Sequence, residues 1–320
     1  MRKRYLHHII MVALLLCVAL PGCDHKAPVA ANPVKIHRLD SLLASGEVMD
    51  NNEMWEAAKA LFAVSGYGEL TDSSLAVYNA NPSITYHAGT VAERMADMSA
   101  AERDFGRLAA RMHELLPGVK FPTVYAVISP FNQSVFTVDS MLFLGVNHYL
   151  GADYEPYGYF PDFVRLRKVP VRMDVDVAET LVRRAYPFEP GSDYPTVLSR
   201  LLYEGAVTEA IMQLTGKEER SVLGYDSEEM KWLEDNEKEA WNALITRKML
   251  YSTDETVAHS LVVLSGVTSS LHPDAPGMAG RFIGHRIVRE YLKHNDAGLE
   301  ELLSPSFYNS ESTLAKSRYY

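Results

Sequence analysis

Apolar residues recur at helical spacing through most of the chain after residue 172, and this pattern limits the fold more than any other feature of the sequence. Asp226 and Glu229 form the sequence pattern of a capping box at one helix start, and Pro276 prevents another helix from extending backwards. Six helices are predicted, at 174–185, 195–214, 226–249, 254–262, 278–293 and 297–303.

The segment from 121 to 147 has a different residue composition, which predicts β-strands. "FPTVYAVIS" and "QSVFTVDSMLFLGVNHYL" are rich in Val, Phe and Thr, with the turn-forming "SPFNQ" around their junction. A sheet of two to four strands is expected, and the 134–147 region is the candidate edge.

Short helices are predicted before this sheet. They lie in "VKIHRLDSLLASG", in "NEMWEAAKALFAVSGYG" and after Ser99, which with Glu102 resembles a capping box. The fold class is therefore α+β: one helix-dominated domain over residues 36–320, with a small antiparallel or mixed sheet.

The N-terminus has the pattern of a lipoprotein signal peptide. A basic start, "MRKR", precedes the apolar run "IIMVALLLCVAL", which is too short for a stable membrane span. "LPGC" follows, with Leu20 three residues before Cys23. This pattern predicts that residues 1–22 are removed. Cys23 is then expected to carry the lipid that anchors the protein to the membrane. Residues 23–35 are expected to form a flexible tether.

The charge and cysteine content narrow the function classes. The chain has two cysteines, and Cys17 lies in the predicted signal peptide, so the mature protein has no disulfide. Its formal charge of -10 becomes -13 when Arg2, Lys3 and Arg4 are removed, since residues 1–22 contain no acid. An acidic body argues against binding nucleic acid or lying flat on anionic lipid.

The chain contains an incomplete version of a zinc peptidase pattern. The expected motif is His-Glu-x-x-His on one helix, with a third ligand from a Glu on a later helix. Here Glu179 has Ala178 and Val182 where the histidines would stand, and Glu204 follows in "LLYEG". The residues leave two interpretations open: degenerate metal-ligand positions, or surface acids beside ordinary core residues.

Other signals of chemistry are weak. The single His-Glu pair, at His113, is followed by Pro117 and is interpreted as a surface feature. There is no phosphate-binding loop, dinucleotide turn or Gly-x-Ser-x-Gly elbow. No metal and no other cofactor are expected. The tyrosines between Tyr149 and Phe160 are expected to pack rather than to form a ligand platform.

A series of phrases in the C-terminal half resembles the gliding motility lipoprotein GldB family. They cover roughly residues 140–320 and occur in the family's order: "LGVNHYLGADYEPYGYFPDFV", "LLYEGAVTEAI", "LGYDSEEMKWLEDNEKEAWNALITRKMLYSTD", "APGMAGRFIGHRIVREYL" and "LAKSRYY". The resemblance implies a cell-envelope lipoprotein linked to the gliding machinery, with a zincin-like, gluzincin-type fold. His285 departs from the family, which often has an aromatic residue there.

The leading hypothesis is a non-catalytic, zincin-like lipoprotein, anchored on the periplasmic face of the outer membrane. It would act as a scaffold or binding component of an envelope machine, with envelope proteins as partners. Two alternatives remain: an active peptidase or glycan hydrolase that uses Glu179 and Glu204, and a ligand-binding lipoprotein that uses the 149–160 loop.

Overall fold

The second half of the chain is helical, as its periodicity predicts. The computed structural model describes residues 31–46, 53–129, 133–192 and 194–320, so the predicted signal peptide and Cys23 lie outside the described residues. The helices of this half are α8 (Met173–Ala185), α9 (Val197–Thr215), α10 (Glu219–Leu223), α11 (Ser227–Asp235), α12 (Glu237–Thr246), α13 (Glu255–Val262), α14 (Ala279–His294), α15 (Leu299–Leu302), α16 (Pro305–Tyr308) and α17 (Glu311–Ser317).

The first half holds the strands and further helices. Its elements are β1 (Ile36–Arg38), α2 (Leu39–Ser45), α3 (Glu53–Val64), α4 (Asp72–Ala80), α5 (Pro82–Arg94), α6 (Ser99–Leu115), β2 (Thr123–Val127), β3 (Val135–Val138), β4 (Met141–Gly145), α7 (Asp162–Arg165) and the 3-10 turns η1 (Val146–His148), η2 (Glu155–Tyr159) and η3 (Pro170–Arg172). The fold is therefore α+β and dominated by helices.

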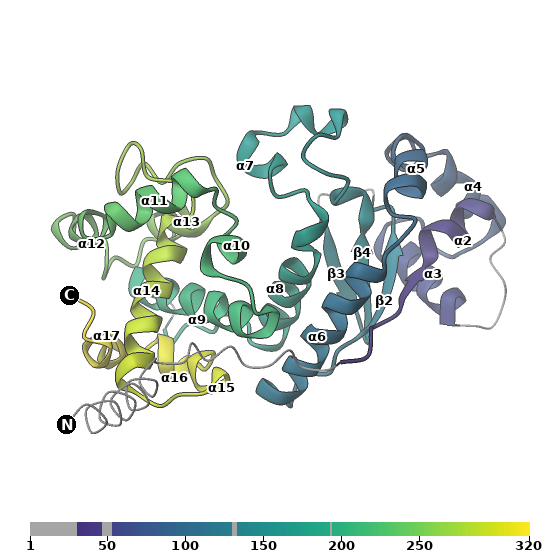
Figure 1. The fold of residues 1–320 in the computed structure, drawn as a ribbon. Helices are drawn as coiled ribbons and strands as arrows, with labels where there is room; N and C mark the ends of the chain where they lie inside the picture. The colour runs from purple at the N-terminus through teal and green to yellow at the C-terminus, as the bar shows by residue number, and fades with distance from the viewer. Residues whose placement is uncertain (1–30, 47–52, 130–132, 193) are drawn as a thin grey trace, which may run out of the picture. The chain divides into compact units, whose positions relative to one another are not determined.

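The sheet is mixed, with strand order β1-β2-β4-β3. β1, β2 and β4 run parallel, and β3 is antiparallel to β4. β3 lies at an edge, as expected for the 134–147 region, but β4 is an interior strand. α8 contacts both β3 and α9, and Figure 1 shows it between the sheet and the C-terminal helices.

Three local predictions are wrong. The segment 36–38, assigned to a helix, is the strand β1, because Ile36 pairs with Val124 before α2 starts. Ser99 does not cap α6, since the Glu102 carboxylate accepts a hydrogen bond from the Ile36 amide at 3.0 Å instead. The expected helix 226–249 is divided at Asn236, whose side chain donates to the Trp232 carbonyl at 2.8 Å and competes with the helix backbone. The capping box of Asp226 and Glu229 is confirmed.

α9 is the central helix of the core. Fourteen of its 19 residues are buried, so it has no broad polar face. It crosses α14 at two glycines, because a Cβ on Gly205 would lie 2.3 Å from the Gly284 carbonyl, and one on Gly284 would lie 1.9 Å from the Leu201 oxygen. The two backbones therefore approach more closely than any larger residue permits.

The residues that precede the sheet lie against α6. The Val34 amide donates to the Glu102 carbonyl at 2.9 Å, and Gly106 leaves room for the backbone of Asn32. These residues form the end of the predicted tether, and residues 31–320 cluster as one compact unit. Within the described ranges, no helix has the length and apolarity needed to cross a membrane.

Candidate functional site

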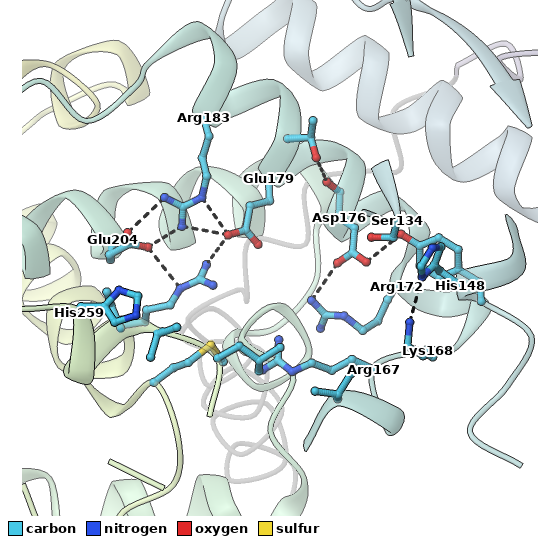
Figure 2. Close-up of a pocket in the computed structure, with 18 of the residues that line it drawn as sticks. Ser134, His148, Arg167, Lys168, Arg172, Asp176, Glu179, Arg183, Glu204 and His259 are labelled. Atoms are coloured by element: carbon cyan, nitrogen blue, oxygen red, sulfur yellow. Dashed lines mark hydrogen bonds and ion pairs between the residues drawn. The ribbon is translucent and has the colours of Figure 1, made fainter. Parts of the chain in front are cut away.

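A cavity of about 610 Å³ lies where α8, α9, α13 and α14 meet the 164–172 segment. Its walls hold six basic side chains and three carboxylates, an excess of three positive charges in a chain of formal charge -10. The basic residues are Arg167, Lys168, Arg172, Arg183, Arg200 and Arg281, and the acids are Asp176, Glu179 and Glu204. Of these residues, Figure 2 shows Arg183 and Glu179 beside Glu204, and Arg172 beside Asp176.

The first group is an arginine clamp on Glu204. Its side chain is 3% exposed and accepts two hydrogen bonds from Arg183, at 3.2 and 2.5 Å. Arg200 Nε lies 3.2 Å from the same carboxylate, and Arg281 Nε lies 3.6 Å away. A buried carboxylate needs such partners, since its desolvation is otherwise costly.

Glu179 completes this clamp from α8. Arg183, one turn further along the helix, donates to Glu179 Oε1 from Nε at 2.9 Å, and Arg281 Nη2 lies 3.2 Å from the same oxygen. Arg183 and Arg281 therefore each pair with both carboxylates. The interpretation of Glu179 and Glu204 as surface acids is wrong, because both lie inside this ionic cluster.

The electrostatics of the clamp hold both glutamates in the charged form. Burial alone would raise the pKa of Glu179, but Arg281 and Arg183 outweigh it and lower that pKa to about 2. For Glu204 too, burial opposes ionisation, and Arg183 and Arg281 lower its pKa below the usual range. The direction of both pKa shifts favours the ionised form of the two carboxyl groups.

The second group surrounds Asp176. Its carboxylate accepts hydrogen bonds from the Tyr149 hydroxyl at 2.8 Å and from Arg172 at 3.2 Å. Burial raises its pKa, against the effect of Arg172. Nearby, Lys168 Nζ lies 2.9 Å from His148 Nδ1. Burial also lowers the pKa of Lys168.

Of the three predicted metal-ligand positions, Glu204 lines the cavity, whereas Ala178 and Val182 do not. Ala178 and Val182 are fully buried in the core, whereas their neighbours Glu179 and Arg183 line the cavity. Their history as former ligand positions stays a prediction. Among the described residues, no three His, Cys, Asp or Glu side chains gather closely enough to hold a metal ion.

The structure also tests the predictions for the His113-Glu114 pair and for the tyrosines of the 149–160 loop. His113 and Glu114 are exposed, which confirms the surface interpretation of this pair. Tyr149, Tyr154 and Tyr157 are buried, and the Leu150 amide donates to the Tyr157 hydroxyl at 3.2 Å, so most of the loop tyrosines pack as expected. Tyr159 is the exception, with 94% exposure.

His285 joins a second buried ionic cluster that the sequence did not predict. It has no exposed surface, and its Nε2 lies 2.9 Å from Glu209 while its Nδ1 contacts Glu219. Burial opposes its charged form, but Glu209 and Glu219 outweigh this effect and raise its pKa. The cluster ties α9, α10 and α14 together, one helical turn from Arg281 of the clamp.

Comparison with known proteins gives one family. The family model described as gliding motility protein GldB matches residues 23–320, a range that starts at the cysteine predicted to carry the lipid. No curated protein and no solved structure gives a significant match.

Proposed function

The chain belongs to the gliding motility GldB lipoprotein family, and we propose that it serves there as a non-catalytic binding component of a cell-envelope assembly. The cavity between α8, α9 and α14 is its ligand site. A concave, pre-formed site with convergent polar groups is the usual form of a ligand pocket.

One observation carries this proposal: the two cavity glutamates are engaged by the chain's own arginines. A glycosidase needs one carboxyl group that stays protonated to act as the acid. Here the pKa values of both Glu179 and Glu204 are lowered. A general base also needs an accessible oxygen, yet both oxygens of Glu204 are paired with arginines, and Arg183 and Arg281 pair with Glu179 at Oε1. This arrangement favours binding over hydrolysis.

A hydrolysis assay tests the non-catalytic part of the proposal. The full protein is incubated with peptidoglycan fragments and with an unfolded protein substrate, in parallel with Glu179→Gln and Glu204→Gln variants whose folding is checked by circular dichroism. We expect no turnover by any of the three. Turnover by the wild type that disappears in a folded variant would overturn the proposal.

The proposed location is the periplasmic face of the outer membrane, through the lipid on Cys23. The match that starts at Cys23 supports a mature chain beginning there. Density-gradient separation of membranes and protease treatment of intact cells test the location. Capture of partners from envelopes, with the lipid intact and Cys23→Ser as the control, tests whether envelope proteins bind the anchored form.

We also propose that the fold is related to the gluzincins. In support, a glutamate of α9 faces a glutamate of α8 across one cluster, as the third ligand and the catalytic glutamate of such a peptidase would. Guanidinium groups now stand between these carboxylates. An experimental structure that superimposes α8 and α9 on the two zinc-binding helices of a gluzincin would support the relation, and a different helix order would refute it.

A further inference from the structure

The half of the cavity beside Arg167 holds positive charge that the chain does not neutralise. Three basic side chains line this half together with one carboxylate, Asp176, so the formal excess is two positive charges. The basic residues are Arg167, Lys168 and Arg172. Asp176 pairs with Arg172 at 3.2 Å. Among the described residues, no carboxylate lies within ion-pairing distance of Arg167 or Lys168. In the other half of the cavity the positive charge is largely neutralised, because three arginines share the two carboxylates of Glu179 and Glu204.

Arg167 is held in an unfavourable place for a cation. It donates a hydrogen bond to the Leu223 carbonyl, which fixes the guanidinium at the cavity wall. Burial lowers its pKa to about 10, and Arg172 and Arg281 add to this effect through repulsion. An anion bound between these groups would offset the cost of burying the Arg167 charge and would weaken its repulsion from Arg172 and Arg281.

Arg281 adds a further positive charge to the wall of the same cavity. Its side chain is 7% exposed, and its Nη2 and Nε atoms lie 3.2 Å from Glu179 and 3.6 Å from Glu204 without forming a hydrogen bond. It belongs to the first turn of α14, which starts directly after the cavity residue Met278. The positive end of that helix dipole adds to the attraction for an anion.

From these contacts we propose that the cavity binds the phosphate group of a phosphomonoester, between Arg167, Lys168 and Arg172. This inference rests on the proposed binding function and names its ligand class. A phosphomonoester carries close to two negative charges at neutral pH, which matches the excess of two. A carboxylate carries one. Guanidinium groups also present paired donors that fit phosphate oxygens.

A neighbouring cavity offers room for the organic part of the ligand. It has a volume of about 620 Å³ and shares Arg167, Arg172 and Met278 with the first cavity. Its wall combines the apolar side chains of Phe163, Leu166, Val169 and Val171 with the carboxylates of Asp162, Glu218, Asp226 and Glu229. The phosphate would lie at the shared arginines, with its substituent on the apolar side.

Calorimetric titration of the full lipidated protein in detergent tests the proposal. The probes are inorganic phosphate, glycerol 3-phosphate and dihexanoyl phosphatidate, with acetate as the monoanion. The variants are Arg167→Gln and Lys168→Gln. Arg184→Gln is the matched control, because Arg184 is an exposed arginine of α8 outside the cavity.

We expect both phosphate esters to bind, and acetate to bind at least about tenfold more weakly. Each cavity variant should weaken the binding of phosphate about tenfold, as expected for the loss of one charge-assisted hydrogen bond, and Arg184→Gln should change it less than about twofold. Tighter binding of dihexanoyl phosphatidate than of glycerol 3-phosphate identifies a lipid headgroup as the source. Equal binding identifies a soluble phosphomonoester.

Two results would overturn the inference: no heat of binding with any phosphate probe, or equal affinities in the wild type and both cavity variants. Because Arg167→Gln could unfold the protein, Lys168→Gln provides an independent reading. A failure of the proposed non-catalytic function would give a different result. Release of inorganic phosphate from glycerol 3-phosphate would show catalysis, and would leave the assignment of the ligand class intact.

Discussion

Replacing Glu179 with glutamine should remove the electrostatic stabilisation that the arginine clamp gives to this carboxylate. Glutamine keeps the shape and can still accept the hydrogen bond from Arg183 Nε, so the change isolates the charge. The Glu179 side chain is 24% exposed, so solvent screens its ion pairs only in part. A pKa lowered from 4.5 to about 2 corresponds to roughly 3 kcal/mol of folding free energy at pH 7.

The pH dependence follows from the direction of this shift. Because the folded-state pKa lies below the unfolded value, the stabilisation is complete above about pH 4.5 and is lost as the pH falls towards 2. The difference in unfolding free energy between wild type and Glu179→Gln should therefore be roughly 3 kcal/mol at pH 7 and about half of that at pH 3.

Urea unfolding at several pH values, followed by circular dichroism, measures this difference. Glu56→Gln is the control, because Glu56 pairs with Lys59 in α3 with 64% of its side chain exposed, and exposed pairs contribute little. A difference for Glu179→Gln below about 1 kcal/mol at pH 7, or one that stays constant down to pH 3, would refute the view that the clamp holds a stabilised, ionised glutamate.

Three further predictions follow from other parts of the molecule. Cys23→Ser should abolish lipid attachment. Mass spectrometry of the mature wild-type N-terminus checks the lipid anchor, and an unmodified chain that starts at another residue would contradict it. Gly284→Ala should destabilise the protein by about 3 kcal/mol or more, since its Cβ would lie 1.9 Å from the Leu201 oxygen. Gly89→Ala, a helical control with no atom within 4 Å of its Cβ, should be neutral or slightly stabilising in thermal unfolding. Purified mature protein should contain no stoichiometric zinc, and elemental analysis that finds about one zinc per chain would overturn this.

The helical half was predictable because its signals are local. Apolar residues at helical spacing and the capping box of Asp226 mark the longer helices, although the expected helix 226–249 is divided and the short helices α10, α16 and α17 were not predicted. β1 was missed for the opposite reason. Three residues carry no periodicity of their own, and Ile36 becomes a strand only because Val124, far along the chain, pairs with it.

The site was predictable in part. The sequence drew attention to Glu179 and Glu204, and the correct signal for their partners was present at helical spacing. Arg183 follows Glu179 by four residues, and Arg200 precedes Glu204 by four, so each pair shares a helix face. Arg281 could not be predicted in this way, because only the packing of α14 on α9 brings it to the cluster.

The glycine contact between α9 and α14 has a consequence for the order in which the protein folds. Gly205 and Gly284 are about 80 residues apart in the chain, so this contact has a high loop-closure cost and forms only after both helices have been synthesised. α9, buried on most of its surface, stays without its main partner until then. Arg281 reaches the cavity by the same step. A chain that ends before α14 would therefore lack the helix that covers α9 and the cavity wall that carries Arg281, although Arg167, Lys168 and Arg172 of the proposed phosphate site would already be present.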